Sequence, residues 1–87
     1  SNFIKYNNYV MESDIKNIPY IVECTRCSKK KKVDRLLRMD ADMYTNMGTD
    51  TTTSERKLIK GNSRKIYYAI KKIDTELGTK LIQAMDK

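Results

Sequence analysis

The chain has 87 residues, a net charge of +7 and no histidine. This length holds one small domain with a single core, and the lack of histidine and of a glycine-rich phosphate loop argues against an enzyme. No apolar run approaches the ~20 residues of a membrane span and no signal-peptide core is visible, so we expect a cytoplasmic protein, or one of the host cytoplasm or nucleus if it is viral.

The positive charge is unevenly distributed along the chain. Residues 24–38 and 56–87 each carry a net charge of +6, whereas residues 1–23 sum to −1 and residues 39–55 to −4. Two basic blocks separated by an acidic one indicate a patterned surface that suits a polyanionic partner. The alternative is a basic surface that is only solvated, as in many small lysine-rich proteins.

Residues 2–23 allow two interpretations. The segments Phe3–Tyr6 and Tyr9–Glu12 can form the strands of a β-hairpin, or the apolar residues at positions 3, 6 and 10 can share one side of a short helix. Pro19 disfavours helical geometry at the residue before it, and the β-branched and aromatic stretch Tyr20–Val22 favours a strand. We therefore expect a small N-terminal β element.

Cys24 and Cys27 have the spacing of a metal-binding CxxC pair. A closed zinc site needs four ligands, and the chain offers neither a second such pair nor histidine, so zinc would require carboxylates or the cysteines of a second chain. A redox CxxC normally opens a helix in a thioredoxin-like βαβ unit, which does not fit this pattern. The sequence favours two ordinary thiols, with no metal and no cofactor.

A first helix is expected over residues 33–46, with Gly48 as its stop. Its apolar residues at helical spacing are Val33, Leu36, Leu37 and Met43. Asp40 and Asp42 would point to different sides of this helix, which makes them a poor catalytic pair. We expect both carboxylates on an acidic surface that balances the basic blocks.

Two more helices are expected after a short polar loop. Thr52, with Glu55 three residues on, has the pattern of a capping box and starts a helix over residues 53–60 that ends at Gly61. Asn62 or Ser63 then caps an amphipathic helix over residues 63–86, whose apolar residues recur at the i, i+3, i+4, i+7 spacing of a buried face.

The length of the last helix points to a second chain. About 26 uninterrupted residues would extend about 39 Å, whereas a domain of this size has a radius of gyration of about 12 Å. Either the helix breaks near Gly78, or its far end packs on a partner, and the second option is favoured because glycine costs only about 1 kcal/mol in a helix. We therefore expect a homodimer whose interface is formed by Ile70, Ile73, Leu77 and Leu81.

The basic residues are the candidate functional site, because cations that neutralise phosphates release condensed counterions. One group opens the first helix, and the other covers the polar side of the last helix around one aromatic ring. The candidate nucleic-acid-binding residues are Lys29, Lys30, Lys31, Lys32, Arg35, Arg38, Arg64, Lys65, Tyr68, Lys71 and Lys72. Residues 52–73 also have the outline of a helix-turn-helix, although Lys57 and Asn62 stand where that motif needs a small and an apolar residue.

Together these features predict one small basic domain over residues 1–87, mainly α-helical, with about three helices and a long C-terminal amphipathic helix. The expected function is that of a small basic nucleic-acid-binding protein, with DNA favoured as the ligand. Size and composition suit a dimeric regulator or accessory factor of phage or mobile-element type. The alternative is a protein-interaction module or inhibitor that docks its basic face on an acidic surface of a larger partner.

Overall fold

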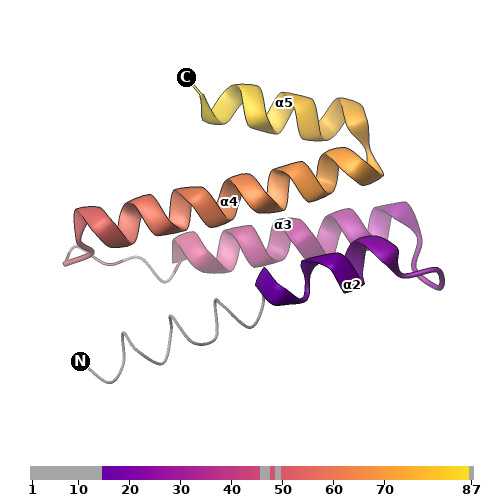
Figure 1. The fold of residues 1–87 in the computed structure, drawn as a ribbon, viewed down its shortest axis with the longest axis horizontal. Coiled ribbons are helices and arrows are strands. Elements are labelled where there is room, and N and C mark those ends of the chain that lie inside the picture. Colours follow the sequence, from indigo (N-terminus) through magenta and orange to yellow (C-terminus); the bar gives the residue numbers. More distant parts are fainter. Residues whose placement is uncertain (1–14, 46–47, 49, 87) are drawn as a thin grey trace.

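The computed structural model describes residues 15–45, 48 and 50–86, and these residues are mainly helical, as the sequence predicts. Four helices cover most of them, namely α2 (Ile18–Glu23), α3 (Lys29–Thr45), α4 (Thr53–Ile73) and α5 (Thr75–Met85). Successive helices run in opposite directions and form a flat slab with extents of 39 × 30 × 15 Å (Figure 1). None of the described helices is long and apolar enough to cross a membrane.

The segment expected to be a strand after Pro19 is helical. Residues 20–22 lie within α2, and Pro19 occupies the first turn of that helix, where its missing N–H would have no intrahelical partner anyway. Ile18 and Ile21, three residues apart, are buried on the inner side of this turn. The hairpin expected over residues 3–12 lies outside the described residues.

The first expected helix is confirmed, but it begins four residues early. α3 starts at Lys29, because the Ser28 hydroxyl accepts a hydrogen bond from the Lys31 backbone N–H at 3.2 Å and so caps the helix ahead of the lysine run. The helix ends at Thr45. All four lysines at positions 29–32 therefore occupy its first turn and the start of its second.

The two helices expected over residues 53–60 and from 63 onward are one continuous helix, so the helix-turn-helix interpretation is wrong. The Thr52 cap is confirmed, since its hydroxyl accepts from the Glu55 N–H at 3.1 Å. Neither Gly61 nor Asn62 interrupts α4, because one glycine costs about 1 kcal/mol in a helix and the apolar stripe continues across it from Ile59 to Ile66.

The helix expected over residues 63–86 is also wrong in its extent, because it is interrupted at Asp74. The backbone of Asp74 is extended, its N–H closes α4 on the Ile70 carbonyl at 2.7 Å, and its carboxylate caps α5 by accepting from the Leu77 N–H at 3.2 Å. α5 then runs back along α4 (Figure 1). Gly78, where a break was the less favoured alternative, lies inside α5.

The fold-back removes the reason for expecting a dimer. The proposed interface residues are used within the chain, since Ile70 is fully buried and Ile73, Leu77 and Leu81 pack against the core. The longest helix, α4, has 21 residues and spans about 31 Å, which fits within the longest extent of the molecule, 39 Å.

The core lies where α2, α3 and α4 meet, and α5 covers one flank of α4. The buried apolar residues of the core are Ile18, Ile21, Val33, Leu36, Met43, Ile59, Ile66, Ala69 and Ile70. Leu36, Ile66 and Ile70 are completely buried, and each full burial contributes roughly 1.5–3 kcal/mol. α5 approaches α4 so closely at Gly78 that a Cβ on this residue would overlap the Lys71 backbone.

Candidate functional site

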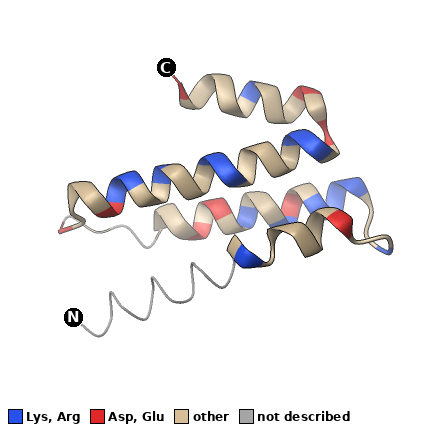
Figure 2. Cartoon of the chain, in the orientation of Figure 1, with Lys and Arg blue, Asp and Glu red and all other residues tan. Residues whose placement is uncertain are grey.

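The basic residues of α4 dominate its outward surface. The helix carries seven Lys and Arg residues and one acidic residue, Glu55. Its buried residues include no Lys or Arg, and the Lys and Arg residues are spread along the length of the helix (Figure 2). This one-sided distribution agrees with the basic face expected from the sequence, although the face belongs to a shorter and differently bounded helix.

A groove between α2 and α4 collects four of the five candidate residues on this helix. Its volume is about 470 Å³, and apolar residues of α2, including Pro19 and Val22, contribute to its lining together with Ala69 of α4. The candidate residues that line it are Arg64, Lys65, Tyr68 and Lys72. Lys71 is exposed but does not line this groove, because its backbone faces Gly78 of α5.

Glu23 also lines the groove, and most of the positive charge of the groove is not engaged in ion pairs among the described residues. Arg64 donates to the Asp86 carboxylate at 2.9 Å, in an ion pair whose two side chains are each about half exposed, so this contact contributes less than about 1 kcal/mol. Lys65 and Lys72 are exposed and form no ion pair within the described part of the chain. Tyr68 is 48 % exposed, so part of this residue is open to solvent.

The lysine run of α3 is not a uniform phosphate-binding patch. The Lys32 ammonium donates to the Val22 carbonyl at 2.9 Å and thereby satisfies a C-terminal carbonyl of α2. This hydrogen bond gives Lys32 a structural role in holding α2 against α3. Lys31 and Arg35 line a separate hollow beside the cysteines, and Arg38 is exposed.

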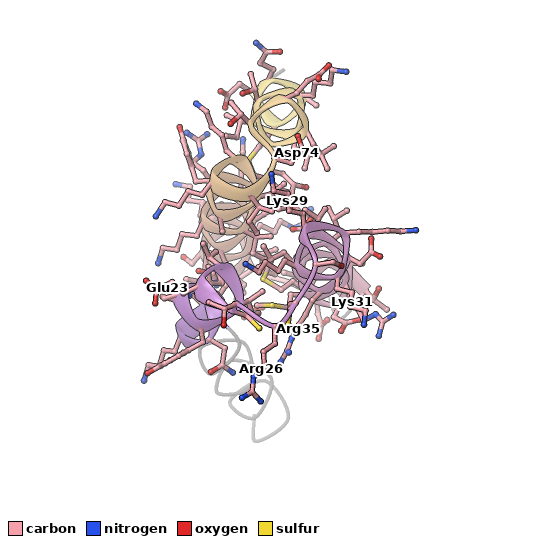
Figure 3. All side chains as sticks on the ribbon, turned by 90° about the vertical axis from the view of Figure 1, so that its right-hand side faces the viewer. Glu23, Arg26, Lys29, Lys31, Arg35 and Asp74 are labelled. Atoms are coloured by element: carbon pink, nitrogen blue, oxygen red, sulfur yellow. The ribbon has the colours of Figure 1, made fainter. Side chains whose placement is uncertain are left out.

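Lys29 and Lys30 lie at the end of the molecule where α4 turns into α5. Both line a hollow of about 580 Å³ with Asp74, and Figure 3 shows Lys29 below Asp74 in this end-on view. The first turn of α3 contains no acidic residue. Cations at the positive end of a helix dipole are unfavourable by roughly 0.3–1 kcal/mol each, so these lysines weaken α3 in the free protein.

The two basic groups are therefore separated in space. Those of α4 line the groove with α2, whereas those of α3 are divided between the cysteine hollow and the α4–α5 turn. The sequence could not reveal this division, because it depends on how α3 and α4 pack. The α2–α4 groove combines three candidate cations with Tyr68, and the cysteine hollow combines Lys31, Lys32 and Arg35 with Tyr20.

A buried polar cluster joins α3 to α4, and it was missed from the sequence. Asp40, expected on an acidic surface, is 8 % exposed and accepts hydrogen bonds from the Ser63 hydroxyl at 2.5 Å and the Tyr67 hydroxyl at 2.6 Å. Ser63 is fully buried. The signal available in the sequence was the position of Asp40, which falls on the same side of the helix as Leu36 and Met43.

The Tyr67 hydroxyl is altered by this environment. Burial raises the pKa of Tyr67 above its ordinary value of about 10, and the hydrogen bond that it donates to Asp40 raises the pKa further. The neutral phenol is thus favoured in the folded state. The protonated Tyr67 hydroxyl therefore stabilises the fold. This stabilisation is fully present below the unfolded-state pKa of about 10, and it is lost as the pH rises through the higher folded-state pKa.

Tyr67→Phe should therefore change the alkaline limb of the stability profile. We expect the variant to be less stable than the parent at neutral pH, because Asp40 loses a donor, and the gap to narrow as the pH rises above about 10. Urea unfolding of both proteins across this pH range measures the gap. A difference that stays constant or widens above pH 10 would contradict the assignment.

Cys24 and Cys27 lie together at the end of α2, with their Sγ atoms 2.6 Å apart. The hydrogen bond between the thiols lowers the pKa of Cys24, and a hydrogen bond with the Arg26 backbone lowers it further. The same thiol–thiol hydrogen bond raises the pKa of Cys27, and desolvation of the Cys27 thiol raises this pKa further. The pair therefore favours the thiolate on Cys24 over the thiolate on Cys27. Among the described residues, no group of three or more His, Cys, Asp or Glu side chains is arranged to hold a metal ion.

Comparisons of the chain with protein-family models, with curated proteins and with solved structures yield no match.

Proposed function

We propose that the protein binds nucleic acid, and that the groove between α2 and α4 holds a segment of single strand. The observation that supports this proposal is the grouping of Arg64, Lys65, Lys72 and a half-exposed Tyr68 around one groove with apolar walls. Non-specific single-strand sites combine a positively charged groove, which follows the backbone, with aromatic rings on which bases stack.

Each part of the groove has a role in this proposal. Lys65 and Lys72 contact phosphates, because their ammonium groups are exposed and are not engaged in ion pairs within the described residues. Tyr68 stacks on an unpaired base, and the apolar walls from Pro19 and Val22 accept the sugar or a base edge. Arg64 adds a cation whose exposed pair with Asp86 is weak enough to exchange for a phosphate.

A single strand is preferred to a duplex because of the shape of α4. Residues 53–73 form one continuous helix after the Thr52 cap, so the recognition helix of a helix-turn-helix has no counterpart in this segment. Base stacking on Tyr68 requires an unpaired base, because bases within a duplex already stack on each other. DNA and RNA strands share the phosphate and base chemistry that the groove offers.

The double variant Lys65→Gln/Lys72→Gln tests the electrostatic part. We expect it to weaken binding of a fluorescent single-stranded oligonucleotide roughly tenfold at low salt, and to reduce the slope of log K against log salt by about 1.4 for two lost contacts. Fluorescence anisotropy over a salt series gives both values. The control is Lys60→Gln/Lys80→Gln, which removes the same charge from positions that do not line the groove.

Equal effects of the two double variants would show that net charge, and not this groove, governs binding.

Tyr68→Ala tests the aromatic part in the same assay, with an expected loss of about 1–3 kcal/mol for single strands and little change for duplex. Tyr44→Ala is its control, because Tyr44 is 43 % exposed but lies outside the groove. Unchanged circular dichroism is required of every variant.

An acidic protein partner is the second candidate, and the apolar lining of the groove favours it. An amphipathic helix with an acidic side could place apolar residues against Val22 and Ala69 while its carboxylates meet Lys65 and Lys72. The oligonucleotide assay separates the two candidates. If neither single-stranded DNA nor RNA binds, the nucleic-acid proposal fails and the protein partner becomes the stronger candidate.

A further inference from the structure

The two cysteines are already positioned as a pair. Cys24 directly follows α2 and Cys27 lies three residues further on in the loop that leads to α3, with the two Sγ atoms 2.6 Å apart. A disulfide bond is about 2.05 Å long, so joining the sulfur atoms requires a shift of only about 0.5 Å. Cys24 is partly exposed and Cys27 is exposed, so reagents in solution can reach both.

The sulfur atoms open into a hollow that is lined with cations. Its volume is about 470 Å³, and its lining includes Lys31, Lys32 and Arg35 of α3 and the exposed Tyr20 of α2. The side chains of Lys31 and Arg35 form no ion pair within the described residues. Figure 3 labels both of these residues in the view from the end of the molecule that carries the α2–α3 loop.

Such surroundings favour two events. Cations beside a cysteine stabilise its thiolate, which is the form that attacks disulfides. Unpaired cations also raise the local concentration of anionic reagents and increase their rate of encounter. The hollow is large enough for part of a small peptide or similar molecule, and its charge selects for carboxylates.

We propose that Cys24 and Cys27 form a reversible dithiol–disulfide site that reacts with an anionic low-molecular-weight disulfide, with Cys24 as the attacking residue. Cys24 has this role because it lies 2.6 Å from the Cys27 Sγ, and this contact and a hydrogen bond with the Arg26 backbone lower its pKa, whereas the same contact raises the pKa of Cys27. Lys31 and Arg35 receive the carboxylates of the reagent. This site is independent of the nucleic-acid proposal, because neither cysteine lines the α2–α4 groove.

The reaction proceeds in two exchange steps. The Cys24 thiolate attacks one sulfur of the small disulfide, forming a mixed disulfide and releasing one small thiolate, which takes up the proton lost from Cys24. Cys27 then loses its proton and attacks the Cys24 sulfur, which forms the intrachain disulfide and releases the second small thiol. The protein dithiol is oxidised by two electrons, and the small disulfide is reduced to two thiols.

Glutathione disulfide is a suitable probe, because each half carries two carboxylates. On incubation with it, the parent protein is expected to lose both titratable thiols and to decrease in mass by two hydrogen atoms, without a retained glutathione adduct. Reduced dithiothreitol should restore both thiols. Two thiols that stay free, or a protein that becomes covalently dimeric instead, would overturn the proposal.

The single variants identify the attacking residue. Cys27→Ser keeps Cys24 and a hydroxyl that can donate to it, so this variant should accumulate the mixed disulfide with glutathione. Cys24→Ser should form the corresponding adduct several-fold more slowly, because Cys27 then lacks the features that lower the pKa of Cys24. Equal rates, or a faster reaction of Cys27, would contradict the assignment of Cys24.

Arg35→Gln tests the selection of anionic reagents. This variant should slow the reaction with glutathione disulfide several-fold, while the reaction with cystamine, a cationic disulfide, should be unchanged or faster. Parallel thiol titrations give the rate with glutathione disulfide and the rate with cystamine, and hence the ratio of the two rates. Circular dichroism checks that the fold is kept. If the ratio of the two rates does not change, Arg35 does not select the reagent and this part of the proposal is wrong.

Discussion

Gly78→Ala is expected to destabilise the protein by about 2–4 kcal/mol, because the added methyl group would overlap the backbone of Lys71. A backbone cannot move aside as a flexible side chain can, so α5 must shift away from α4. That shift would expose the apolar residues Ile73, Leu77 and Leu81, which pack against the core. A domain of 87 residues has a stability of roughly 4–13 kcal/mol, so the loss is a large share of the total.

Gly61→Ala is the matched control, and it should have the opposite effect. Gly61 lies in the interior of α4, and nothing stands within 4 Å of the position that its Cβ would occupy. Replacing it removes only the helix penalty of glycine, so we expect a gain of up to about 1 kcal/mol. Urea unfolding followed by circular dichroism measures both variants.

The two glycine variants together test the fold-back at Asp74. If α5 continued α4 as a single long helix, Gly78 would lie in an ordinary helix interior, and both substitutions would stabilise the protein by similar amounts. A stabilising Gly78→Ala variant would therefore contradict the packing of α5 on α4. It would also restore the argument for a partner chain along the apolar side of that helix.

The second large effect is expected at Asp40. Asp40→Ala removes the acceptor for the Ser63 and Tyr67 hydroxyls and leaves the fully buried Ser63 hydroxyl without this partner. Together with the cavity that it creates, this change should cost about 2–4 kcal/mol. Asp42→Ala, two residues away and exposed, is the control and should change the stability by less than about 0.5 kcal/mol.

A compensated variant separates the hydrogen bonds from simple loss of volume. In Asp40→Leu/Ser63→Ala/Tyr67→Phe, all three polar partners are replaced by apolar groups, so no buried donor or acceptor of this cluster is left unsatisfied. We expect its stability to recover most of the loss seen in Asp40→Ala, as measured by the same urea titrations. If Asp40→Ala is as mild as Asp42→Ala, the cluster does not hold α3 against α4.

The local features of α3 and α4 could be predicted because neighbouring residues determine them. The periodic apolar residues of α3 indicate a helix wherever that segment packs, and the Thr52 cap depends only on the Glu55 N–H three residues on. The basic side of α4 follows from the same periodicity, because cations opposite an apolar stripe must face solvent. These interactions span one or two helical turns, so the sequence by itself determined them.

The helix boundaries could be predicted only in part, because several signals compete along residues 52–86. Gly61 and Asn62 have the local pattern of a helix boundary. Burial of the apolar residues of α4 on both sides of them outweighs the cost of glycine in a helix, which is about 1 kcal/mol. Asp74 has the local pattern of a cap, with Glu76 in the following turn, and it was overlooked because the apolar spacing continues through it. Packing of α5 on α4 decides between these signals.

The candidate site depended most on the tertiary structure. Packing of α2 beside α4 creates the groove around Tyr68, and packing of α2 beside α3 brings Lys32 to the end of α2. The arrangement of the helices also separates the two groups of basic residues that were predicted together from the sequence. The sequence by itself determined a helical, basic and one-sided molecule, since charge and periodicity are local properties. Only the tertiary structure decided that Asp40 is buried and that Asp74 reverses the chain, because both outcomes depend on contacts between residues more than 20 positions apart or between whole helices.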